Sequence, residues 1–256
     1  MKILALDTAT ENCSAALALD GELRSREVEM ERGHAERILP MIDELLAEAG
    51  IGLANLDAIA FGRGPGSFTG VRLAATVTQG LAFGAGLGVV PVSDLQAVAQ
   101  RAFRTNQKPK RVLVCNDARM SEVYWACFER GDDGLAKLVG EERVSKPADV
   151  RLPPKWPTAA AVGRGFVAYA EALLAALPTV TFGTDLLAAT GAMQPGPTED
   201  SAPLTCLLPH ALDIALLAAP HVVAGKLLPP EAATPVYLRD NVAHVAHSPK
   251  PPTSAH

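Results

Sequence analysis

Apolar residues in the first hundred positions of the chain follow two periodicities in turn. Runs of strand length come first, and Asp20-Gly21, a pair typical of a β-hairpin, joins two of them. Longer segments follow in which apolar residues recur every three or four positions, as in the segment that ends before Gly50. The pattern predicts strands at 2–7, 13–19 and 22–30, a helix at 34–49, a strand at 56–61, a helix at 71–85, a strand at 88–92 and a helix that ends at Arg104.

The pattern starts again after a polar stretch at 105–110. A strand at 111–116 precedes Asp117, and a polar turn and two more strands follow, as they do after Asp7, so we infer two structurally related halves. The rest of the chain predicts a strand at 158–162, a helix at 167–177, an irregular loop at 188–205, a helix at 207–224, an extended segment at 235–239 and a disordered tail.

This order of elements predicts both the class of fold and its division. An antiparallel hairpin followed by alternating strands and helices indicates an α/β fold with a mixed sheet covered by helices. We expect an N-terminal lobe at 1–104, a C-terminal lobe at 105–206, a final helix and extended segment at 207–245 that return toward the N-terminal lobe, and a tail at 246–256.

A glycine-rich stretch, Gly62 to Arg72, stands between the strand at 56–61 and the helix after it. Its central residues, which we treat as one motif loop, are Gly64, Pro65, Gly66, Ser67, Phe68 and Gly70. The glycines permit positive φ angles or close backbone approach, and Ser67 and Thr69 can cap the next helix, whose start suits an anion. A tight turn that merely packs well explains the same residues. The stretch lacks the lysine of a Walker A loop, and its G-x-G-x-x-x-G spacing differs from that of a dinucleotide fingerprint.

Composition and charge narrow the class of protein. The chain has 256 residues, of which 48% are hydrophobic and 20% charged, as in ordinary globular proteins. Its net charge of −5 provides no global basic field that would hold nucleic acid. No apolar run approaches the ~20 residues of a membrane helix, and the first apolar run is too short for a signal peptide. The four cysteines form no C-x-x-C pair, so we expect reduced buried thiols and a cytoplasmic protein.

An acidic residue follows the equivalent strand in each half of the chain. In the first half Asp7 precedes Thr8 and Thr10, and in the second the acid is Asp117. The first arrangement resembles a phosphate loop of the actin-like ATPase fold, in which the acid orients metal or water and turn amides hold phosphate. These four residues are therefore candidates for nucleotide binding, although a capping or turn role for Asp7 fits the pattern equally well. His34, a lone histidine before a helix, is better explained as a polar cap or surface residue than as a metal ligand.

Four motifs stand in the order in which a known family carries them. They are Ile3 to Thr10, the glycine-rich stretch, Asp117-Ala118-Arg119 with Glu122-Val123-Tyr124, and Pro235 to Arg239. Over residues 1–245 the chain resembles the bacterial TsaB family, also called YeaZ. The resemblance implies the two-lobed actin-like ATPase (ASKHA) fold, with a mixed five-stranded sheet and helices in each lobe. It also implies a role in making N6-threonylcarbamoyladenosine next to the tRNA anticodon, together with a catalytic paralogue, TsaD, and an ATPase, TsaE.

Set beside this resemblance, the residues of the chain favour a non-catalytic subunit. The catalytic paralogue binds its metal with a His-x-x-x-His pair, whereas the matching positions here are Asp94, expected to cap a helix, and Val98, which cannot ligate. The adenosine loop of the paralogue has no clear counterpart, and Gly163-Arg164-Gly165 is the nearest candidate. We therefore expect no metal and no tightly bound cofactor, with ATP or ADP bound weakly or at the interface of the assembled complex. An autonomous actin-fold ATPase or kinase that uses the four candidate residues, and a metallopeptidase-like enzyme, remain as alternatives.

Two helices, at 34–49 and 69–84, are expected to carry the partner surface. The second is rich in small residues, which would let another backbone approach closely. The residues expected in the interface are His34, Ile38, Met41, Leu45, Thr69, Arg72, Ala75, Thr76, Gln79 and Phe83. Packing of both helices into the core of their own lobe is the alternative.

The same surface is expected to serve more than one assembly. We expect the chain alone to form a two-fold homodimer, and a TsaD-like transferase to compete for the same surface. A TsaE-like ATPase is expected to join the complex of the two proteins, and tRNA is expected to meet this chain only indirectly, through the complex. A large charged residue at Ala75 or Ala82 is expected to disturb pairing and to leave the fold largely intact.

Overall fold

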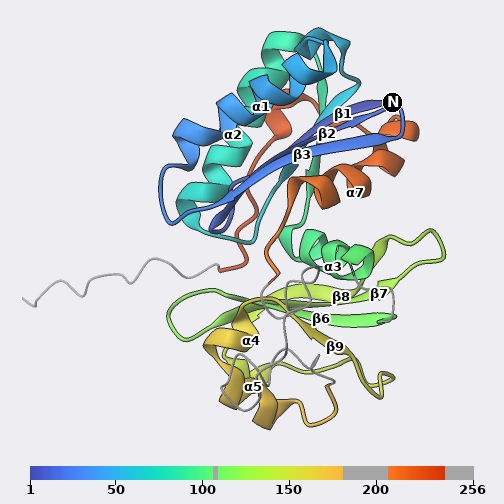
Figure 1. Cartoon of the computed structure of the whole chain (residues 1–256). Helices are drawn as coiled ribbons and strands as arrows, with labels where there is room; N and C mark the ends of the chain where they lie inside the picture. Colours follow the sequence, from blue (N-terminus) through green and yellow to red (C-terminus); the bar gives the residue numbers. More distant parts are fainter. Residues whose placement is uncertain (106–108, 181–206, 240–256) are drawn as a thin grey trace, which may run out of the picture.

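The computed structural model describes residues 1–105, 109–180 and 207–239. Its elements form two lobes, each built on a β-sheet, and helix α3 (Asp94–Thr105) lies between them (Figure 1). This arrangement confirms the predicted two-lobed α/β fold.

The first lobe contains the predicted mixed sheet of five strands. The strands are β1 (Lys2–Asp7), β2 (Asn12–Leu19), β3 (Glu22–Glu29), β4 (Ala58–Gly62) and β5 (Gly88–Val92), in the order β3-β2-β1-β4-β5. β1, β2 and β3 pair antiparallel, and Asp20-Gly21 forms the turn between β2 and β3 with positive φ at both residues. β1, β4 and β5 pair parallel, so the carboxyl ends of these three strands lie at one edge of the sheet.

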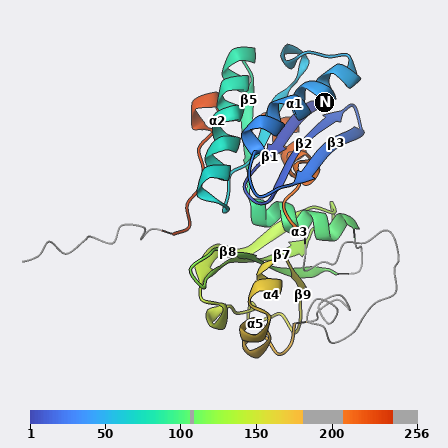
Figure 2. The same ribbon diagram turned by 60° about the vertical axis from the view of Figure 1, so that its left-hand side comes forward.

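Helices cover both faces of this sheet. α1 (His34–Ala49) and α2 (Phe68–Ala85) pack on the face to which Leu4 points, and α3 and α7 (Ala211–Val223) pack on the face to which Ile3 points. Figure 1 shows α1 and α2 on one side of the sheet and α7 on the other, and Figure 2 shows α1 and α2 again from another direction. Successive residues of a strand point to opposite faces, so a strand that is covered on both sides reads as a continuous apolar run.

The second lobe is built on a smaller sheet. Its strands are β6 (Arg111–Asp117), β7 (Val123–Arg130), β8 (Ala136–Ser145) and β9 (Ala160–Val162), in the order β8-β7-β6-β9. Five strands were predicted in each lobe, whereas the described residues of this lobe form four, since one short parallel strand, β9, follows the antiparallel strands.

Shorter elements complete the described chain. The helix predicted at 167–177 is divided into α4 (Gly165–Ala168) and α5 (Ala170–Ala176), because Tyr169 between them leaves the helical conformation. Single turns of 3-10 helix lie at Leu53–Asn55, Pro147–Asp149 and Pro230–Ala232. The loop predicted at 188–205 and the tail predicted at 246–256 lie outside the described residues.

The two lobes share one hydrophobic core around α3. Leu95 and Val98 of this helix belong to the same buried cluster as Val90 of the first sheet and Val112 of the second. The amide of Gln96 also donates to Ala136 O of β8 at 2.8 Å. Helix α3 therefore holds both sheets, although it directly follows the strands of the first lobe in sequence.

The last described part of the chain returns to the first lobe. The helix predicted at 207–224 begins only at Ala211, because the ring of His210 caps it and accepts a hydrogen bond from Leu212 N at 2.9 Å. After α7 the segment at 235–239 runs beside the glycine-rich loop, where Val236 N donates to Arg63 O at 2.7 Å.

Candidate functional site

The glycine-rich loop packs directly against the turn that follows β1. Ser67 N donates to Ala9 O at 2.7 Å. A Cβ atom at Gly66 would lie 2.5 Å from Ala9 O, and one at Gly70 would lie 2.0 Å from Thr8 O, so the two backbones leave no room for a side chain. Ser67 caps α2 as predicted, since its Oγ accepts a hydrogen bond from Gly70 N at 3.1 Å. The glycines thus serve close backbone approach.

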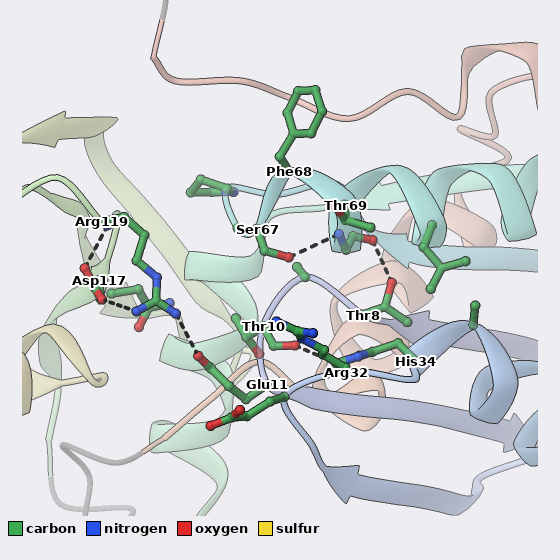
Figure 3. Close-up of a pocket in the computed structure, with 18 of the residues that line it drawn as sticks. Thr8, Thr10, Glu11, Arg32, His34, Ser67, Phe68, Thr69, Asp117 and Arg119 are labelled. Atoms are coloured by element: carbon green, nitrogen blue, oxygen red, sulfur yellow. Dashed lines mark hydrogen bonds and ion pairs between the residues drawn. The ribbon is translucent and has the colours of Figure 1, made fainter. Parts of the chain in front are cut away.

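A cavity of about 610 Å³ opens between the lobes beside this loop (Figure 3). It is lined by the turn after β1, the residues at 31–36, the glycine-rich loop and the residues at 116–119. A neighbouring cavity of about 410 Å³ shares Thr10, Glu11 and Arg119 with it and reaches α4. Cavities of these sizes are typical of small-molecule sites.

The four residues predicted to bind nucleotide have different positions around this cavity. Thr10 and Asp117 line it, and Thr8 lies at its wall with its hydroxyl donating to Gly70 O at 2.7 Å. Asp7 is fully buried and lines neither cavity; one of its carboxylate oxygens accepts a hydrogen bond from Ala9 N at 3.0 Å. The turn role that the sequence left open for Asp7 is therefore the one that the structure shows.

Asp94 lies beside Asp7 under the glycine-rich loop, and both carboxyl groups are completely buried. A Cβ atom at Gly62 would lie 2.3 Å from Asp94 Oδ1 and 2.5 Å from Asp7 Oδ1, which places the two groups in one small space. Burial raises the pKa of both carboxyls, and the charge of Asp7 raises that of Asp94 further, well above its usual range. The protonated form of Asp94 is thus favoured beside Asp7, and its other carboxyl oxygen accepts a hydrogen bond from Gly64 N.

The pattern Ser93-Asp94-Leu95-Gln96 is typical of a capping box, and Ser93 caps α3 as that pattern predicts, since its Oγ accepts a hydrogen bond from Gln96 N at 3.2 Å. The expectation that Asp94 itself is a helix cap is wrong. The proximity of Asp7 and Asp94 could have been inferred only from the parallel arrangement of β1, β4 and β5. This arrangement brings the carboxyl ends of β1 and β5 to one edge of the sheet.

Two arginine side chains of the second lobe form ion pairs with acids around the cavity, including Glu11 and Glu29 of the first lobe. The guanidinium of Arg119 lies 3.2 Å from Asp117 and 3.5 Å from Glu11 (Figure 3). Arg164 lies 2.6 Å from Glu29 and 3.9 Å from Glu11. Because both arginines are paired with acids, the cavity offers little net positive charge to attract the phosphates of a nucleotide.

Asn116 is a cavity residue that the sequence analysis did not single out. It is buried, it lines both cavities, and neither polar atom of its amide has a hydrogen-bond partner among the described residues. Its only sequence signal is its place directly before Asp117.

His34, the first residue of α1, contacts the turn after β1. Its Nε2 lies 2.8 Å from Thr10 O, and the ring also lines the larger cavity. The described residues contain no group of three or more histidine, cysteine or acidic side chains placed to hold a metal ion.

Several residues predicted to contact a partner are in fact part of the core of the first lobe. Ile38, Met41, Leu45 and Ala75 are buried between the helices and the sheet. These positions form the apolar stripes of α1 and α2, which cover the sheet and cannot also face another protein. Ala82 is fully buried as well, so the expectation that a charged residue at Ala75 or Ala82 would leave the fold intact is wrong.

The outer face of α2 is exposed over its whole length. It carries Thr69, Arg72, Thr76 and Phe83, whose side chain is 80% exposed. A Cβ atom at Gly80 on the same face would meet nothing within 4 Å. At the edge of this face the amide of Gln79 donates to Glu231 O at 3.3 Å.

Three cysteines of the described residues are buried thiols. Cys13, Cys115 and Cys127 are free and buried, and desolvation raises the pKa of Cys13 to about 11 and that of Cys127 to about 12. Within residues 1–105, 109–180 and 207–239, no helix has the length and apolar character needed to cross a bilayer.

Known proteins with similar sequences and structures point to one family. The family described as TsaD, tRNA N6-adenosine threonylcarbamoyltransferase, matches residues 28–247. The tRNA threonylcarbamoyladenosine biosynthesis protein TsaB of Escherichia coli is 40% identical over 95% of this chain and 96% of its own length. TsaB of Haemophilus influenzae is 46% identical over 67% of this chain and 75% of its own. The crystal structure of YeaZ from Pseudomonas aeruginosa, 41% identical, superimposes with a TM-score of 0.76 over 93% of this chain and 99% of that one.

Proposed function

The chain belongs to the TsaB family of tRNA threonylcarbamoyladenosine biosynthesis proteins, and we propose that it acts there as a non-catalytic subunit that binds and activates a TsaD-like transferase. The observation that carries this proposal is the exposed outer face of α2. A helix that buries its apolar stripe in its own lobe and still presents Phe83 and Gly80 to solvent has a face that a second protein can cover.

Helix α1 extends this face. Both helices cover the same side of the first sheet (Figures 1 and 2). Leu39 of α1 is 44% exposed. A stable interface buries roughly 1,200–2,000 Å² in total, which one helix cannot supply. We propose that the outer faces of α1 and α2 together form the surface, with Thr69, Arg72, Thr76 and Phe83 in it. In the absence of the transferase the same surface pairs two copies of the chain about a two-fold axis.

The structure of the cavity supports a non-catalytic role. Asp7 accepts a hydrogen bond from Ala9 N within its own turn, Thr8 donates to Gly70 O of the glycine-rich loop, and Arg119 pairs with acids, so few groups are left for a triphosphate. We propose that ATP or ADP binds the isolated chain weakly, and that a TsaE-like ATPase joins the assembled complex, with tRNA held through the transferase. An autonomous ATPase predicts the opposite: tight ATP binding by calorimetry, and hydrolysis that Asp7→Ala abolishes.

Binding to a purified TsaD-like transferase tests the proposal. We expect Phe83→Arg to abolish co-elution with the transferase and to convert a homodimer to a monomer by light scattering. Val223→Arg is the matched control, because Val223 is equally apolar and 79% exposed but lies at the end of α7 on the opposite side of the sheet. Circular dichroism should show both variants folded. Unchanged co-elution and pairing of Phe83→Arg would place the interface elsewhere.

A further inference from the structure

The extended segment at 235–239, which we call the C-terminal strap, connects three parts of the molecule. At one end Val236 N donates to Arg63 O of the glycine-rich loop at 2.7 Å. In the middle Tyr237 lies against the first turn of α2: its hydroxyl accepts a hydrogen bond from Arg72 Nε at 2.7 Å, and its ring centroid is 6.0 Å from that of Phe68. At the other end Arg239 reaches the loop between β6 and β7 in the second lobe.

The loop that Arg239 reaches has an unfavourable backbone. Arg119, Met120 and Ser121 are three consecutive residues in the left-handed region, with φ of 60°, 55° and 59°. A non-glycine residue in this region is unfavourable and persists only where its surroundings fix it. Packing does not fix the tip, since Met120 is 73% exposed.

Arg239 holds both ends of this loop. Its guanidinium donates to Ala118 O at 3.2 Å and forms an ion pair with the carboxylate of Glu122. Between these anchors Ala118 N donates to Glu122 O at 2.9 Å, which closes the base of the loop. A planar guanidinium can satisfy a carbonyl and a carboxylate at once, a geometry that a lysine ammonium does not reproduce.

The loop in turn carries Arg119 into the cavity between the lobes. That side chain lies between Asp117 and Glu11 and belongs to the left-handed stretch whose two ends Arg239 contacts; Asp117 also accepts a hydrogen bond from Arg119 N at 2.7 Å. The strap also touches the outer face of α2, because Arg72 of that face donates a hydrogen bond to the hydroxyl of Tyr237 and its guanidinium lies 5.6 Å from the centroid of the Tyr237 ring. One short segment thus contacts both the proposed partner surface and the loop that shapes the cavity.

We infer that Arg239 is a positioning residue, through which the C-terminal strap couples the start of α2 to the placement of Arg119 in the cavity between the lobes. A protein that packs on Phe68 and Arg72 would also press on Tyr237, and the strap would carry that contact to the loop. The effect of a partner rests on the proposed function; the coupling within the chain does not.

Amide hydrogen exchange of the full chain alone tests the coupling. Arg239→Ala should speed exchange of the amides at 119–123 by at least about tenfold, because a hydrogen bond to a charged group is lost. Arg239→Lys should restore only part of the protection, because a lysine ammonium does not reproduce the geometry of the guanidinium. Arg143→Ala is the matched control, since it removes a surface arginine that pairs with Glu141 on β8 and should leave these amides unchanged.

The decisive variant is Tyr237→Ala, which removes the contact with α2 and leaves Arg239 in place. Coupling predicts faster exchange at 119–123 as well as at the start of α2. A change confined to α2, or an unchanged loop in Arg239→Ala, would overturn the inference whether or not the chain binds a transferase. A TsaD-like protein added to the wild type should slow exchange at 119–123, and should not do so in Tyr237→Ala. If the TsaD-like protein does not bind the wild type, amide exchange at 119–123 stays the same. That result would refute the proposed function and would leave the inferred coupling within the chain intact.

Discussion

Replacing Asp94 by asparagine should make the protein more stable than the wild type as the pH rises. Asparagine has nearly the shape of a protonated aspartic acid. Its amide nitrogen can donate to Asp7, and its carbonyl oxygen can accept the hydrogen bond from Gly64 N that the carboxyl accepts now. The variant therefore keeps the contacts under the glycine-rich loop and removes only the titration of one buried group.

The sign and the size of the effect follow from the raised pKa of Asp94. The unfolded chain loses this proton near pH 3.8, whereas the folded protein keeps it to a much higher pH because the carboxyl is buried beside Asp7. Between those two pH values the unfolded state binds fewer protons, so the stability of the wild type falls as the pH rises, by about 1.4 kcal/mol for each pH unit from one such group. Asparagine does not titrate, so the variant does not lose this stability. The free energy of unfolding of the variant should therefore increasingly exceed that of the wild type as the pH rises.

Urea denaturation followed by circular dichroism from pH 5 to pH 8 measures this difference. Subtracting the wild type from the variant removes the titration of all other groups that both proteins share. Asp133→Asn provides a control: the hydrogen bond from Leu135 N lowers the pKa of Asp133, so its contribution is complete above pH 5 and the difference should stay constant. Parallel stability curves of Asp94→Asn and the wild type would refute the account of the buried pair.

Three further predictions concern packing and charge in the first lobe and α7. Gly70→Ala should destabilise the fold by about 1–3 kcal/mol, since its Cβ would lie 2.0 Å from a carbonyl oxygen, whereas Gly80→Ala, with open space, should stabilise α2 by about 0.5–1 kcal/mol; urea denaturation compares them. Burial lowers the pKa of His210 to about 4, so stability should fall as the pH falls from 6.5 to about 4, and His210→Asn should flatten that loss in the same titration. Ala82→Arg should abolish the cooperative thermal unfolding that Phe83→Arg retains, because only the first buries an unpaired charge.

The local signals of the chain predicted the first lobe well. Asp20-Gly21 forms the predicted hairpin turn, the helix at 34–49 begins and ends at the predicted residues, and Ser67 caps α2. Each of these features depends on a few neighbouring residues. The number of strands in the second sheet was taken from the family resemblance, which is a less direct source.

Features that depend on distant residues could not be predicted from one sequence. The apolar stripes of α1 and α2 were assigned to a partner, because periodicity shows which face is apolar and cannot show what covers it. The pairing of Asp7 with Asp94 joins residues 87 positions apart, so it required the order of strands in the sheet. The contact of Arg239 with the loop at 118–122 likewise depends on the path of the chain after α7.

Formation of the modified nucleoside tests the central claim most directly. Unmodified tRNA is incubated with a TsaD-like transferase, a TsaE-like ATPase, ATP and an activated threonylcarbamoyl donor, and N6-threonylcarbamoyladenosine is quantified by mass spectrometry after digestion. We expect product only when this chain is added, little product with Phe83→Arg, and full product with Val223→Arg. Equal product without this chain, or product from this chain in the absence of the transferase, would contradict its assignment as a non-catalytic subunit.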